Sequence, residues 1–157
     1  IRDSKDIAKG TERIGIIASS GGRRLRAEGI DVKNEIKPAN WFLNGEDDVR
    51  SSYYLEEIAT EFDIQGLEID YTCLAWDINL YFDNGWNSQN FKGSKWQKIN
   101  QQSTKNYLLN SYRVLLTRAR QGMIIYVPEV DGQDPTRCKK MYDDTFNYLE
   151  KCGLDII

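Results

Sequence analysis

The sequence predicts an α/β fold with a mainly parallel sheet, because short β-rich runs alternate with helical patterns along the chain. Two apolar runs, residues 13–19 and 69–76, are the clearest strands. The third observation is the segment 110–128, in which a helix with three arginines leads into a short β-run. With 157 residues, 40% of them hydrophobic, the chain can bury a core, and we expect one domain over 1–157.

The first strand breaks at the Ser-Ser-Gly-Gly sequence of residues 19–22, and a helix is expected from Arg23. A weaker strand is expected over 30–36, closed by Pro38 and followed by a short apolar segment at 41–43. The strand at 13–19, the break at 19–22 and the helix from Arg23 would together form a strand–turn–helix unit.

A helix is also expected from Asp48, because apolar residues recur at helical spacing as far as Phe62. Its glutamates, including Glu57 and Glu61, are offset toward solvent in this interpretation. The helix would lead into a Gln-Gly-Leu-Glu turn at 65–68, directly before the buried strand.

Residues 80–99 depart from this regular pattern. Asp83, Asn84 and Gly85 form a strong hairpin signal, which predicts a β-hairpin insertion. Aromatic residues alternate there with lysines, so two interpretations remain open. The aromatics can pack across the strands, or they can stack with the bases of a single strand while lysines follow its phosphates. The residues of the second interpretation are Trp86, Trp96, Lys92 and Lys95.

Segment 110–128 carries Arg113, Arg118 and Arg120, and Gln121 with Gly122 is expected to end its helix before a buried strand at 123–127. Guanidinium groups at the end of a sheet suit phosphate, although pairing with carboxylates would also explain them. Near the end of the chain, Asp134 and Pro135 predict the start of a helix that runs to Gly153.

The sequence of 65–68 resembles motif V of superfamily 1 helicases, and 112–120, with its Thr-Arg-Ala core, resembles their motif VI. The finer pattern is similar to a Schlafen-type helicase branch with many bacterial members, over about residues 12–152. This resemblance implies the second, C-terminal RecA-like domain, a three-layer sandwich. It also implies ATP and Mg²⁺ as cofactors, bound mainly by an N-terminal P-loop domain of the same polypeptide, and DNA or RNA, single-stranded, as partner.

The resemblance assigns catalytic roles to Arg118, as an arginine finger, and to Arg24, with Arg23 as the alternate motif IV position. The residues that would contact the nucleotide are Glu68, Gly66, Gln65 and Arg113. The sequence departs from the pattern at Asn110, where many relatives carry the first motif VI arginine.

Composition restricts the chemistry further. The chain has no histidine, which removes the usual general base, and its three cysteines lack metal-ligand spacing, so no metal site is expected. No Gly-x-x-x-x-Gly-Lys loop occurs, so we expect the chain alone to hydrolyse no ATP. A net charge of −3 means that any nucleic-acid binding needs a local basic patch. We expect no membrane association. We expect a cytoplasmic location. The alternative function is a non-catalytic module that binds nucleic acid or protein.

Overall fold

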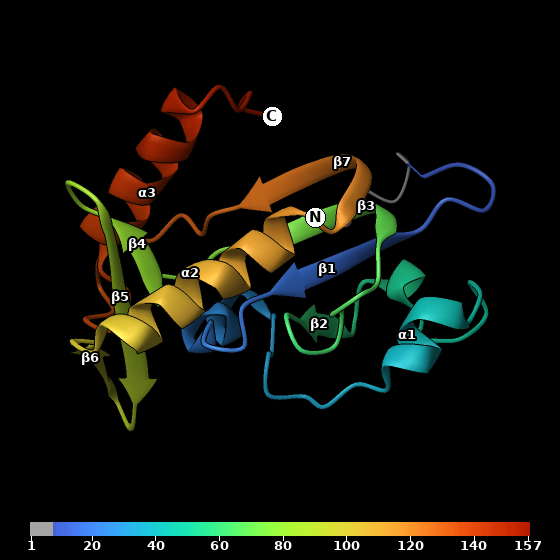
Figure 1. Ribbon diagram of the computed structural model, residues 1–157, viewed down its shortest axis with the longest axis horizontal. Coiled ribbons are helices and arrows are strands. Elements are labelled where there is room, and N and C mark those ends of the chain that lie inside the picture. Colours follow the sequence, from blue (N-terminus) through green and yellow to red (C-terminus); the bar gives the residue numbers. More distant parts are fainter. Residues whose placement is uncertain (1–7) are drawn as a thin grey trace.

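The computed structural model describes residues 8–157, and a four-stranded parallel sheet forms its centre (Figure 1). The order of strands is β2-β1-β3-β7. The strands are β1 (Ile14–Ala18), β2 (Ile58–Thr60), β3 (Ile69–Ala75) and β7 (Ala119–Tyr126). Helices flank this sheet, and an antiparallel sheet is inserted between β3 and β7. The expected α/β, RecA-like fold with an insertion is therefore confirmed.

The central strands bury both of their faces, as parallel strands do. Along β1, Ile17 joins the hydrophobic cluster under α2 (Gln102–Leu116), whereas Ile16 and Ala18 join a second cluster on the opposite face. That face is covered by the 3₁₀-helices η2 (Arg23–Glu28) and η3 (Ser52–Tyr54), which contribute to its packing. The sheet thus lies between two layers.

The insertion is a three-stranded antiparallel sheet of β4 (Leu80–Phe82), β5 (Trp86–Lys92) and β6 (Lys95–Lys98). At the first turn, Asn84 and Gly85 adopt positive φ angles of 53° and 140°, as the hairpin signal required. The insertion is confirmed and contains a second turn, between β5 and β6. Figure 1 shows it at the carboxyl ends of the central strands, beside α3 (Lys139–Lys151).

The helix expected over 48–62 is wrong. Leu55 adopts a left-handed φ of 58°, which ends the 3₁₀-turn η3, and the next apolar residues form the short strand β2. Ile58, Ala59 and Thr60 pair in parallel register with β1, so burial in the sheet outweighs the helical spacing of the apolar side chains. Glu61 is consequently buried rather than directed to solvent.

The strand expected over 30–36 is also wrong: its buried residues Ile30, Val32 and Ile36 pack against the sheet without pairing with it. The helix expected from Arg23 is the six-residue 3₁₀-helix η2, which ends at Gly29 with φ of 79°. The apolar segment that follows forms α1 (Pro38–Leu43).

Two helix boundaries differ from the sequence-based expectation. Helix α2 ends at Leu116 instead of Gln121, because the Thr117 hydroxyl bonds back to the Arg113 carbonyl and the Ile69 amide bonds to the Arg118 carbonyl. Strand β7 therefore starts early, and as an edge strand it is only half buried. Asp134 does not cap α3, because its carboxylate binds the amide and hydroxyl of Thr136 instead.

Candidate functional site

The turn at residues 65–68 and Arg118 meet at the amino edge of the parallel sheet. The turn directly precedes β3, and Arg118 directly precedes β7, which pairs with β3. One guanidinium nitrogen of Arg118, Nη1, donates to the Leu67 carbonyl oxygen at 3.1 Å. The two segments that resemble helicase motifs V and VI are therefore in direct contact.

Arg118 is held by three hydrogen bonds within the chain. Besides the bond to Leu67, its Nε donates to the Val114 carbonyl at 3.0 Å and its Nη2 to the Thr117 hydroxyl at 3.1 Å. A cation at the carboxyl end of a helix is favoured by the helix dipole, and here it also satisfies a terminal carbonyl of α2. Since guanidinium has five N–H donors, two of them have no partner among residues 8–157 and remain for a ligand.

The other predicted nucleotide-binding residues are exposed at or near this edge. Gly66 has φ of 81°, which forms the turn, and Gln65 and Glu68 on either side of it are exposed. Arg113 is exposed on α2, where its Nη1 donates to the Asn110 side chain at 2.9 Å. Asn110, where the resemblance to motif VI leads us to expect an arginine, accepts this bond and contributes no charge.

Arg24 lies at the opposite edge of the sheet, because it follows β1 whereas Arg118 precedes the parallel strand β7. A strand rises about 3.3 Å per residue, so the eight residues of β7 separate the two edges by roughly 23 Å. The Arg24 guanidinium binds Asp134 at 2.5 Å and covers the Phe91 ring. The structure does not bring Arg24, or the neighbouring Arg23, to Arg118.

Comparison with models of protein families identifies a match over residues 2–129 to the Schlafen group 3 DNA/RNA helicase domain. The chain belongs to this family. The match includes every strand of the parallel sheet and both segments at its amino edge, and it ends before α3. No curated protein and no solved structure matches the chain.

At the carboxyl edge of this Schlafen-type helicase domain, hydrogen bonds fix the loop of residues 19–24. Glu61, at the end of β2, accepts bonds from the Ser20 amide and hydroxyl, both at 2.8 Å. The Asn79 amide donates to the Ser19 hydroxyl at 3.0 Å. Asp77 accepts a bond from the Arg24 amide at 2.8 Å. Neighbouring strand ends on both sides of β1 therefore hold this loop.

Asp77 is the centre of this buried network. Its carboxylate also accepts bonds from the Tyr142 hydroxyl at 2.6 Å and the Ile78 amide at 2.8 Å. Burial raises the pKa of Asp77 above its usual range, although the hydrogen bonds from Tyr142 and the backbone oppose this shift. The Tyr112 hydroxyl of α2 donates to Asn79 at 2.7 Å. Sequence reasoning missed these residues. The pattern that could have indicated them is the presence of polar residues, Asp77 and Asn79, directly after the apolar run of β3.

In a P-loop domain the loop after one strand cradles phosphate, and an Asp at another strand end holds Mg²⁺. Here the loop after β1 and Asp77 after β3 have corresponding positions, but the carboxylate of Asp77 is fully buried and bonded within the chain. Within residues 8–157 no group of three or more acidic, histidine or cysteine side chains could hold a metal ion. In that same part of the chain, no helix has the length and apolar character needed to cross a bilayer.

The aromatic residues of the insertion do not form one platform. Trp86 packs between Trp76 and Tyr148, with ring centroids 5.5 and 5.3 Å away. Trp96 pairs with Phe91 across the strands, and its indole nitrogen donates to the Thr136 carbonyl at 2.8 Å. Because side chains alternate along β5 and Phe91 is five residues after Trp86, the two tryptophans project from opposite faces.

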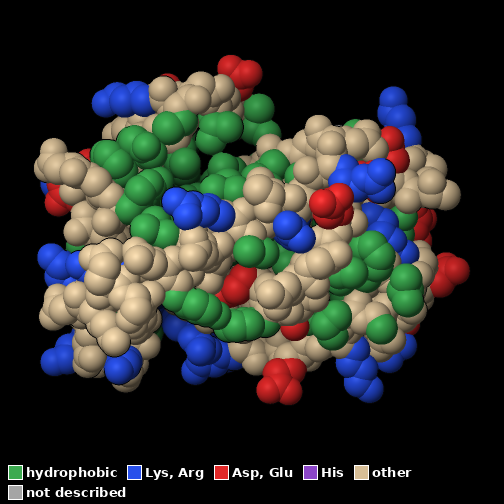
Figure 2. Space-filling view, in the orientation of Figure 1, with side chains coloured by type: hydrophobic (Ala, Val, Ile, Leu, Met, Phe, Trp, Pro, Cys, Tyr) green, Lys and Arg blue, Asp and Glu red, His purple; other side chains and the backbone are tan. Residues whose placement is uncertain are grey.

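Lys92 and Lys95 lie beside the turn between β5 and β6, directly opposite each other in register, and both are exposed. Figure 2 shows Lys and Arg side chains spread over this end of the molecule. The cross-strand packing predicted for the aromatics is present, while base stacking on Trp86 and Trp96 stays a prediction.

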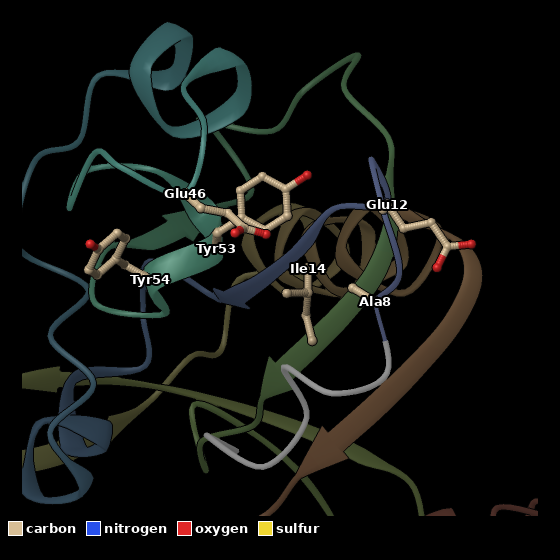
Figure 3. A pocket seen from close by; sticks show the side chains of 7 residues that line it. Ala8, Glu12, Ile14, Glu46, Tyr53 and Tyr54 are labelled. Carbon is tan, nitrogen blue, oxygen red and sulfur yellow. The ribbon is translucent and has the colours of Figure 1, made fainter.

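Two hollows lie away from Arg118 and from the loop after β1, the first of them beside the start of β1. One, of about 340 Å³, is lined by Glu12, Ile14, Glu46 and Tyr53, and Figure 3 shows Glu12 directed away from the other side chains. Its polar groups therefore do not converge on one point. Figure 2 shows hydrophobic side chains gathered around the other hollow, between α3 and β7.

Proposed function

We propose that this chain is the second RecA-like half of an ATP-dependent DNA or RNA helicase or translocase of superfamily 1. In this proposal Arg118 reaches the γ-phosphate of ATP as an arginine finger. ATP and Mg²⁺ are held mainly by a P-loop domain of the same polypeptide, and Gln65, Gly66, Glu68 and Arg113 contact the nucleotide. An arginine finger stabilises the charge on the transferring phosphoryl group. This stabilisation increases the rate by on the order of a thousandfold or more.

The observation that carries the proposal is the hydrogen bond from Arg118 to the Leu67 carbonyl. It joins the two segments that the resemblance assigns to nucleotide binding, although 51 residues separate them in the sequence. The bonds to Val114 and Thr117 restrict the guanidinium further. A cation held in this way loses little conformational freedom when a phosphate arrives, which is the preorganisation that electrostatic catalysis requires.

The test is the nucleic-acid-stimulated ATPase activity of the full-length protein with Arg118→Ala. We expect kcat to fall by about a thousandfold or more, while the affinity for ATP falls only modestly, because a finger acts mainly in the transition state. Arg120→Ala is the matched control: Arg120 is exposed two residues away, and we expect its removal to leave the rate nearly unchanged.

Because Arg118 also stabilises the end of α2, a folding defect must be separated from a catalytic one. Thermal unfolding of both variants gives the first control. The second is chemical rescue with guanidinium ion, which would restore turnover to Arg118→Ala if only the missing cation limits the rate. Unchanged turnover in Arg118→Ala would refute the assignment.

The second candidate is a non-catalytic module that binds nucleic acid or protein. One observation favours it: each of the three guanidinium nitrogens of Arg118 donates a hydrogen bond within the described part of the chain. These bonds give the side chain a structural role. A full-length protein without ATPase activity, but with nucleic-acid or protein binding, would support this candidate over the first.

A further inference from the structure

We infer that a basic pocket at the carboxyl edge binds the phosphate backbone of single-stranded nucleic acid. The pocket lies between η2, the loop that follows it and the turn between β5 and β6, and has a volume of about 320 Å³. Its lining residues are Arg23, Arg24, Arg26, Asp31, Val32, Lys33, Phe91 and Gly93. The inference rests on the proposed function for the identity of the ligand, and it assigns that ligand to the edge of the sheet opposite Arg118.

The pocket holds four cations and one carboxylate, on a chain whose net charge is −3. Asp31 pairs with Arg26 at 3.4 Å, and Asp134, outside the pocket, pairs with Arg24 at 2.5 Å. The side chains of Arg23 and Lys33 have no carboxylate within ion-pair distance among residues 8–157. This local excess of positive charge is the basic patch that an acidic chain needs in order to attract phosphate.

Arg24 supplies a fixed wall for this pocket. Its amide is bonded to the buried Asp77, and its guanidinium is held between Asp134 and the Phe91 ring. Its Nε is buried and has no hydrogen-bond partner in the described part of the chain.

The arrangement of charges favours an extended polyanion over a compact one. The next cations, Lys92 and Lys95, flank the turn that borders the pocket and face each other in register. Like charges directly opposite each other destabilise a strand pair unless an anion lies close. Successive phosphates of one strand would neutralise the pocket and then this lysine pair. The Phe91 ring already contacts the Arg24 guanidinium and, in an edge-to-face arrangement, Trp96, so we expect contact with the nucleic-acid backbone and no base specificity.

The test is fluorescence anisotropy of the 157-residue chain with labelled oligo(dT) and oligo(U) of about 15 nucleotides, the length of a typical single-strand site. The variant is Arg23→Gln with Lys33→Gln, and the matched control is Lys37→Gln with Lys105→Gln, which removes the same charge from outside the pocket. We expect the pocket variant to bind at least about tenfold more weakly at about 50 mM salt, and its salt dependence to be shallower by about 1.4 in the slope of log K against log salt.

Equal losses in both variants would overturn the inference, since binding would then follow net charge alone. Pyrophosphate is the second probe: if it binds in a manner that depends on Arg23 and Lys33 while neither oligonucleotide binds, the pocket takes free phosphate and the inference also fails. Neither outcome depends on ATP hydrolysis. The proposed arginine finger can therefore fail while this site stands, and the reverse also holds.

Discussion

The Tyr112 hydroxyl offers a sharp test of the buried network at the carboxyl edge. The side chain is 2% exposed, and its hydroxyl donates to the side-chain amide oxygen (Oδ1) of Asn79 at 2.7 Å. Tyr112→Phe removes this donor without changing the shape of the ring, so the Asn79 oxygen loses its partner inside the protein. An unsatisfied buried acceptor costs about 1–3 kcal/mol, and we expect the free energy of unfolding to fall by about 2 kcal/mol.

The assay is urea unfolding followed by circular dichroism. With an m-value of about 2 kcal/mol per molar, the loss lowers the urea midpoint by about 1 M. The same loss lowers the melting temperature by about 4–8 °C for a chain of this size. Tyr107→Phe is the control on the same helix, because Tyr107 is 54% exposed and its removal should change stability by less than about 0.5 kcal/mol.

A second comparison separates the hydrogen bond from other effects of the substitution. In a double-mutant cycle with Asn79→Ala, the two losses should couple by about 0.5–3 kcal/mol, as expected for residues in contact. Equal stability of Tyr112→Phe and Tyr107→Phe would refute the reasoning, because it would mean that Asn79 is satisfied without α2. Additive losses in the cycle would refute the direct bond.

Two further predictions concern packing and pH. Gly15→Ala should destabilise the protein by about 1–3 kcal/mol in urea unfolding, because a Cβ there would lie 2.4 Å from the Trp41 ring, whereas Gly45→Ala meets no neighbour and should have little effect. Burial, followed by the hydrogen bond to Glu28, raises the pKa of Tyr126 to about 12. A raised tyrosine pKa adds stability that is present below about pH 10 and is lost as the pH rises through about 12. The free energy of unfolding of Tyr126→Phe should therefore fall less between about pH 10 and pH 12 than that of the unchanged protein. If the two proteins lose stability equally over this range, the raised pKa of Tyr126 is contradicted.

The central strands could be predicted from the sequence because they are continuous apolar runs, and β1 and β3 have almost the expected bounds. The short elements within 48–62 could not be predicted in this way. A helical spacing of apolar residues over 48–62 also fits a 3₁₀-turn followed by the three-residue strand β2, and only pairing with β1 decides between them. Local spacing carries no information about such a partner, which lies about 40 residues away in the sequence.

The amino-edge site could be predicted more fully than the carboxyl-edge network. Both helicase-like segments directly precede a strand, so parallel pairing of β3 and β7 was sufficient to bring Arg118 to the turn at 65–68. The same argument places Arg24 at the other edge, since it follows its strand. By contrast, the bond between Tyr112 and Asn79 depends on how α2 crosses the sheet, which the order of elements does not determine.

The packing of the loop after β1 bears on how the two halves of the proposed ATP site divide their work. A phosphate-binding loop needs open backbone amides, and its glycines let the phosphate approach. Here a Cβ on Gly21 would lie 2.7 Å from the Asn79 amide nitrogen, and Gly22 packs against Leu25 and Asp77. Side chains of the domain itself therefore occupy the space beside these glycines. This packing supports the proposal that the chain contributes to ATP chemistry through Arg118 at its amino edge, and that the phosphate-cradling loop belongs to another domain.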